Sequence, residues 1–214
     1  MPSLIRKSQD LVFIFDIGGV VIKWPNNDPI FRYVGARYGV SFPRMKRAMH
    51  DDLVRVESGE LVPKEYIAMC LGRVGKKIRR GDDPDKLLTA AFEKLAKPRL
   101  GTIAIIKSLK NRGYPVYALS NTSPPHVKVM KKRGWTEPLF DRFFASCELG
   151  MLKPEAEIFQ RVMSEVGAKP RNVVFVDDNE ANVRGALRAG IGTALRFQNL
   201  ALLMKQVSKL LRSA

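Results

Sequence analysis

Three acidic side chains follow apolar segments of this chain directly. Asp16 follows the run VFIF, and Asp177 and Asp178 follow the run VVFV. An ionised carboxylate that is buried without a partner is costly, so Asp16 requires a metal, a cation or a place at a surface. Carboxylates that leave positions open for water and substrate oxygens bind Mg²⁺. A carboxylate can also attack phosphorus and form an acyl phosphate, so these residues indicate metal-assisted phosphoryl chemistry.

Further polar residues stand at the ends of two other apolar runs. Ser120 and Asn121 follow VYAL, and Lys153 comes shortly after FFAS. A lysine and the N–H groups at a helix N-terminus hold phosphate oxygens. Ser120, Asn121 or Asp178 alone would also serve as a helix cap. Asp16 is followed by Gly-Gly-Val-Val instead of a helix start, so capping does not explain the whole set.

The apolar runs alternate with helical patterns, and this alternation predicts an α/β fold with a Rossmann-like parallel sheet. Because the carboxyl ends of parallel strands share one edge of the sheet, we expect the polar residues to meet there. The predicted strands are Leu11–Ile17, Pro115–Leu119, Phe143–Ser146, Asn172–Val176 and Thr193–Phe197. The predicted core helices are Thr102–Asn111, Pro125–Arg133, Glu155–Val166, Glu180–Ala189 and Leu200–Leu211.

A purely helical pattern separates the first strand from the rest of this core. Four candidate helices open at or near a proline, which a first helical turn tolerates: Pro29–Tyr38, Pro43–Val56, Pro63–Val74 and Pro84–Leu95. We therefore expect an α/β core of residues 1–25 and 98–214. Residues 26–97 form an inserted all-α cap at the ligand-binding edge of the sheet.

The composition narrows the class of protein. The 214 residues are 45% hydrophobic and 27% charged, as in ordinary globular proteins. The net charge of +16 attracts anions, but no aromatic-interleaved motif accompanies the basic clusters, which disfavours nucleic acid as a partner. The polar, basic first ten residues and two unpatterned cysteines predict a cytoplasmic protein that does not span a membrane.

Four segments occur in an order and spacing that resemble a known family. They are FDIGGVV (15–21), LSNTS (119–123), GMLKPEAEIF (150–159) and VDDNEANVRGALRAGI (176–191). Together they resemble the ordered motifs of the haloacid dehalogenase-like (HAD-like) hydrolases. The segment VESGELVPKEYI (56–67) is similar to the helical cap of the capped phosphatase branch. The resemblance covers nearly the whole chain, and it includes an Asp-x-Gly form of the first motif.

The resemblance implies roles for the metal ligands first. Asp16 would be the nucleophile and a Mg²⁺ ligand, and Gly18 would offer its backbone carbonyl to the same ion. Asp177 would be the second carboxylate ligand, with Asp178 helping directly or through water. Asn182 would steady the loop that carries this acidic pair.

The resemblance also implies a phosphate site. Ser120 and the Asn121 N–H would bind the transferring phosphate, and Gly19 belongs to the same phosphate-binding set. Lys153 would pair with Asp16 and with the phosphate, so the predicted catalytic set is Asp16, Ser120 and Lys153.

One position departs from the family pattern. In most phosphatases of the family that this chain resembles, an aspartate lies two residues after the nucleophile. That aspartate serves as general acid and base. Here that position is Gly18. The chain has two histidines, and histidine titrates in the useful range. We consider His126, after Ser120, as the substitute proton donor; otherwise His126 is a surface residue and His50 an exposed cap residue.

The function predicted on these grounds is Mg²⁺-dependent hydrolysis of a small phosphorylated metabolite, a sugar phosphate or a nucleotide, through an aspartyl phosphate. One alternative is a metal-independent 2-haloacid dehalogenase, in which Asp16 attacks carbon. Such enzymes resemble this chain less, because they carry an aromatic residue at the position of Gly18 and lack the paired acids. A second alternative is a binding protein that keeps the fold with little catalysis, which Gly18 and the positive charge suggest.

Overall fold

The computed structural model describes residues 10–24 and 26–212. The predicted core also included residues 1–9, Pro25 and residues 213–214, which lie outside the described residues. Five parallel strands form the central sheet, in the order β5-β4-β1-β6-β7. The strands are β1 (Val12–Phe15), β4 (Val116–Ser120), β5 (Arg142–Ala145), β6 (Val173–Asp177) and β7 (Thr193–Arg196). The predicted α/β class with a parallel sheet is therefore confirmed.

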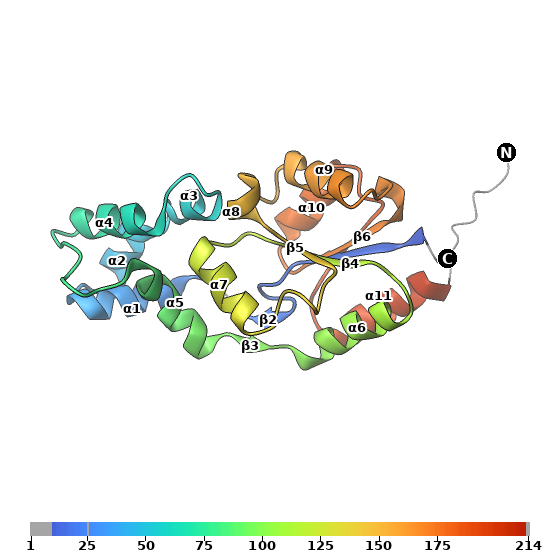
Figure 1. The fold of residues 1–214 in the computed structure, drawn as a ribbon, viewed down its shortest axis with the longest axis horizontal. Coiled ribbons are helices and arrows are strands. Elements are labelled where there is room, and N and C mark those ends of the chain that lie inside the picture. Colours follow the sequence, from blue (N-terminus) through green and yellow to red (C-terminus); the bar gives the residue numbers. More distant parts are fainter. Residues whose placement is uncertain (1–9, 25, 213–214) are drawn as a thin grey trace.

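Helices cover both faces of this sheet (Figure 1). Side chains alternate between the faces along a strand. Thus Phe13 and Phe15 pack in a cluster with residues of α6, α7 and α11, whereas Ile14 packs with residues of α9 and α10. These helices are α6 (Leu100–Asn111), α7 (Pro124–Lys132), α9 (Ala156–Glu165), α10 (Glu180–Arg188) and α11 (Leu200–Arg212). The four-residue helix α8 (Ser146–Leu149) follows β5.

A group of helices projects beyond the end of the sheet (Figure 1). It contains α1 (Asp28–Tyr38), α2 (Phe42–Met49), α3 (Leu53–Glu57), α4 (Pro63–Arg73) and α5 (Pro84–Leu95). Their apolar faces bury a hydrophobic cluster of their own, including Phe31, Tyr38 and Tyr66. Trp24 packs against both this cluster and the core cluster that contains Phe13, so it lies where the helical group meets the sheet.

The helical segment departs from the prediction in two places. The expected helix Pro43–Val56 is two helices, α2 and α3, and Asp52 in the turn between them is held by Arg55 and Arg73. The two segments that link the helical group to the core pair with each other as a two-stranded antiparallel ribbon. Its strands are β2 (Ile22–Lys23) and β3 (Lys97–Pro98). Strands of two residues are too short to produce a periodic pattern, so the ribbon could not be predicted from the sequence.

Within residues 10–24 and 26–212, the helices are all too short or too polar to cross a membrane.

Candidate active site

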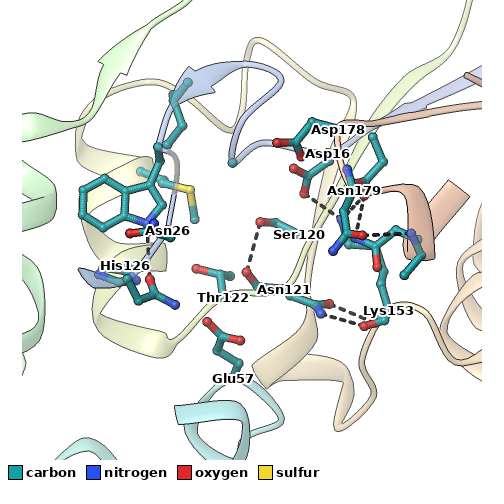
Figure 2. A pocket seen from close by; sticks show the side chains of 18 of the residues that line it. Asp16, Asn26, Glu57, Ser120, Asn121, Thr122, His126, Lys153, Asp178 and Asn179 are labelled. Carbon is teal, nitrogen blue, oxygen red and sulfur yellow. Dashed lines mark hydrogen bonds and ion pairs between the residues drawn. The ribbon is translucent and has the colours of Figure 1, made fainter. Parts of the chain in front are cut away.

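The carboxyl ends of three neighbouring strands bring the predicted residues together (Figure 2). Asp16 follows β1, Asp177 ends β6 and Ser120 ends β4. All three side chains are buried, whereas Asp178 is exposed. One carboxylate oxygen from each of Asp16, Asp177 and Asp178 lies within 4.8 Å of the others. A crowded set of carboxylate oxygens is the donor type that Mg²⁺ prefers, so the residues fit that ion.

Lys153 is the cation of this cluster. Its buried Nζ donates to Asp16 Oδ1 at 2.6 Å, to Asp177 Oδ2 at 2.7 Å and to the Leu119 carbonyl at 3.0 Å. Burial alone would lower the pKa of Lys153, but the two carboxylates outweigh burial and raise it. One lysine cannot neutralise both acids. Burial, together with the charge of Asp177, therefore raises the pKa of Asp16 to about 7, although Lys153 acts in the opposite direction.

Amide side chains hold these charged groups in place. The Asn121 side chain accepts from the Lys153 backbone N–H at 2.9 Å and donates to the Lys153 carbonyl at 2.8 Å. Asn182 donates to Asp177 Oδ2 at 3.0 Å, as expected for a residue that steadies the acidic loop. The Asn121 side chain thus positions Lys153, a contact that the sequence did not predict because these residues are far apart in the chain.

Gly19 allows the loop after β1 to approach the acidic pair. Its φ is +79°, which favours glycine, and a Cβ at this position would lie 2.1 Å from Asp178 Oδ2. Its carbonyl oxygen accepts from Arg99 Nε at 3.0 Å. The Asp178 carboxylate therefore lies directly against Gly19, while Gly18 lines the cavity.

The two histidines have different surroundings: His50 is exposed on the helical group, as expected, whereas His126 is buried. His126 is buried, so the reading of His126 as a surface residue is wrong; its Nε2 lies 3.2 Å from the Leu88 carbonyl. Burial lowers its pKa to about 4, although the bond to Leu88 acts in the opposite direction. A neutral imidazole bonded to a backbone carbonyl is a poor source of protons at neutral pH. The His50 side chain is 63% exposed and contacts Asp51.

The cavity beside the acids has a volume of about 350 Å³ and two unlike ends. The acids, Ser120 and Lys153 line one end. The other end, where Figure 2 places His126 and Asn26, includes the aromatic and apolar residues Ile22, Trp24, Phe92 and Met130. Trp24 and Phe92 meet edge to face, with 5.0 Å between ring centroids, and Phe92 contacts His126 at 4.4 Å. The sequence did not predict this aromatic wall.

Glu57 at the end of α3 also lines the cavity, although its position in the sequence did not predict a site residue. Figure 2 shows its side chain entering from the helical group, near Thr122. Burial raises the pKa of Glu57 to about 7, although a hydrogen bond from Asn27 and the charge of Lys153 oppose the shift. The only signal for it was its place inside the cap-like segment VESGELVPKEYI.

Comparison with known proteins confirms the resemblance. The family model described as haloacid dehalogenase-like hydrolase matches residues 12–190, which is most of the chain. The chain belongs to the haloacid dehalogenase-like hydrolases. As a HAD-like hydrolase it is an enzyme, and the acidic cluster described above lies within the matched residues.

Several relatives of this HAD-like hydrolase have more specific names. A sesquiterpene phosphatase of Aspergillus oryzae is 26% identical over 182 residues, which cover 83% of this chain and 85% of the relative. A flavin mononucleotide hydrolase of Arabidopsis thaliana is 23% identical over 209 residues, which cover 97% and 80%. A HAD family enzyme of Bacteroides thetaiotaomicron, solved with magnesium and inorganic phosphate, matches with a TM-score of 0.72 at 25% identity and covers 88% of this chain and 94% of that one.

Proposed function

We propose that this chain is a Mg²⁺-dependent phosphatase that cleaves phosphomonoesters through an aspartyl phosphate at Asp16. The observation that carries the proposal is the cluster at the sheet edge, where one buried lysine bridges two buried carboxylates and a third acid lies within 4.8 Å. The name of the sesquiterpene phosphatase and the magnesium and phosphate in the related crystal structure support it.

In the proposed first step, Asp16 attacks the phosphorus of the substrate. Lys153 holds Asp16 Oδ1, so Oδ2 is the oxygen that forms the new P–O bond while the ester P–O bond breaks. The Ser120 hydroxyl, the Asn121 N–H and Lys153 would hold the phosphate oxygens and stabilise their charge. Water then attacks the aspartyl phosphate, which releases inorganic phosphate and restores Asp16.

Mg²⁺ would be held by Asp16, Asp177, Asp178 and the Gly18 carbonyl, and when bound it screens the approach of an anionic nucleophile to an anionic phosphate. In the protein itself, Asn182 fixes one oxygen of Asp177, and the Asn179 N–H donates to the other at 2.8 Å. These bonds orient the carboxylate toward the cluster. Such support around ligands is typical of metal sites.

We propose that residues 26–97 act as a cap over the cavity. Helices α1–α5 bury a cluster of their own, which supports the division from the core of residues 1–25 and 98–214. Residues from both parts line the cavity, including Glu57 and Phe92 from the cap and Ser120 and Lys153 from the core. A cap in this place would exclude water from the reacting groups.

We propose that the leaving group carries a flat or apolar part. A phosphate at the acidic end would place the rest of the substrate toward Trp24, Phe92 and Met130. Aromatic walls bind flat rings and apolar groups. Within the two classes considered from the sequence, this favours a nucleotide over a bare sugar phosphate, and the names of the sesquiterpene phosphatase and flavin mononucleotide hydrolase agree with such a leaving group.

The test is phosphate release from a panel of nucleotides, prenyl phosphates and sugar phosphates, with Mg²⁺ and with EDTA. We expect Mg²⁺-dependent turnover that Asp16→Asn abolishes. Asp51→Asn, which alters a 90% exposed acid, is the matched control and should retain activity. Absence of turnover across the panel with Mg²⁺ present, or halide release from a 2-haloacid in EDTA, would contradict the proposal.

A further inference from the structure

The proposed reaction needs a proton for the departing oxygen, and residue 18 has no side chain to supply one. Four acids line the cavity among the described residues: Asp16, Asp177, Asp178 and Glu57. The first three form the cluster around Lys153 and the proposed metal site. Glu57 is the fourth, and it reaches the cavity from α3, across from the strand ends.

The backbone of Glu57 is tied to the core at the edge of the site. The Ser146 hydroxyl donates to the Glu57 carbonyl at 2.5 Å and accepts from the Thr122 N–H at 2.9 Å. Two residues further along, a Cβ on Gly59 would lie 2.5 Å from the Cys147 carbonyl. The end of α3 therefore packs closely against the loop that follows β4 and against α8.

The side chain of Glu57 is oriented by a second set of contacts. Trp24 Nε1–H donates to Asn27 Oδ1 at 3.3 Å, which leaves the Asn27 amide nitrogen to donate to the Glu57 carboxylate. Figure 2 shows Glu57 near Thr122 and Asn121, between the acidic end and the aromatic end of the cavity. This is the region in which the bond between the phosphate and its leaving group would lie.

We propose that Glu57 donates a proton to the leaving group and then accepts one from the attacking water. The inference rests on the phosphatase function proposed above. When the ester P–O bond breaks, the oxygen of the leaving group takes the Glu57 proton and departs as an alcohol. The Glu57 carboxylate then removes a proton from the water that attacks the aspartyl phosphate, so both residues return to their initial states.

The electrostatic surroundings of Glu57 suit both steps. Lys153 acts on it across the cavity, and Asn27 is its polar neighbour; Tyr66 of α4 and Cys147 of α8 are the other titratable side chains that interact with its charge. With a pKa near 7, the group exists in both protonation states at neutral pH, which is the condition for efficient acid–base work. Since the donor must be protonated for the first step, turnover of a poor leaving group should fall as the pH rises through this value.

The test compares two leaving groups in the variant Glu57→Gln, which keeps the shape of the side chain. With an alkyl phosphate, whose alkoxide needs a proton, loss of a general acid should lower kcat about 10²–10⁴-fold. With 4-nitrophenyl phosphate, whose phenolate departs without one, the loss should be much smaller. The fall in kcat at high pH for the alkyl ester should disappear in the variant.

Glu65→Gln, an exposed glutamate on α4, is the matched control and should behave as wild type. Turnover of 4-nitrophenyl phosphate shows that each variant is folded. Equal losses for both substrates, or an unchanged pH profile in Glu57→Gln, would overturn the role of Glu57. If wild type hydrolyses neither substrate with Mg²⁺ present, the phosphatase proposal itself fails, so the two failures are distinguishable.

Discussion

Burial of a neutral imidazole at His126 predicts a measurable loss of stability in acid. The pKa of His126 is about 4 in the folded protein, against about 6.5 in the unfolded chain. The unfolded chain therefore binds this proton more readily, so the contribution to stability is complete above pH 6.5 and declines as the pH falls toward 4. Between about pH 7.5 and pH 4.5, linkage gives a loss of about 2–3 kcal/mol in the free energy of unfolding.

The assay is urea unfolding at both pH values for wild type and His126→Gln, which keeps an N–H donor for the Leu88 carbonyl but cannot titrate. Wild type should lose about 2 to 3 kcal/mol more than the variant over this range. His50→Gln, at the exposed histidine, is the control and also leaves His126 as the single histidine. In that variant, the His126 ring signals in NMR should not titrate between about pH 5 and 8. Equal losses in wild type and His126→Gln, or a ring that titrates near pH 6.5, would refute the reasoning.

Two further predictions concern the charge cluster and the contact between the helical group and the core. Lys153→Met leaves two buried carboxylates without their cation, so it should lower the free energy of unfolding, measured in EDTA, by about 3–5 kcal/mol. It should also abolish turnover with Mg²⁺ present. A loss of stability under about 1 kcal/mol would show that the ion pair is solvated. Gly59→Ala places a Cβ 2.5 Å from the Cys147 carbonyl, whereas Gly75→Ala, also at positive φ, meets no atom within 4 Å. The first should therefore lower the thermal midpoint more than the second, and equal shifts would show that this close contact is unimportant.

The fold was largely predictable because its elements carry strong periodic or apolar patterns. The order of the predicted strands and helices in the core is the one observed, with small differences at the ends of elements, but the short helix α8 after β5 was not predicted. The break between α2 and α3 was not predicted, because no glycine or proline marks it in the sequence; in the folded chain Asp52 in this turn is paired with Arg73 of α4. The ribbon of β2 and β3 depends likewise on a distant pairing of two short segments.

The site residues that directly follow a strand could be predicted from the sequence. Those whose place in the site depends on contacts between distant segments could not. Asp16, Ser120 and Asp177 meet because their strands are neighbours in one parallel sheet. The burial of His126 depends on α5 packing against α7, which places Leu88 and Phe92 beside it. Glu57 was not predicted for the same reason. In the sequence, a glutamate at the end of a short helix is typical of a solvent-exposed residue, and only the folded chain places Glu57 in the cavity. The individual catalytic roles remain predictions.

The open space beside Gly18 bears on which residues the second position after the nucleophile can accept. Its φ does not lie in the left-handed region, and a Cβ there would meet only Asp16 Oδ2, at an ordinary contact distance of 3.9 Å. The backbone at position 18 therefore accepts a Cβ without rearrangement. A single substitution, Gly18→Asp, would give the first motif a second acid. Under the proposed role of Glu57, the two arrangements of the proton donor then differ by one substitution, with the donor on the core in one and on the helical group in the other.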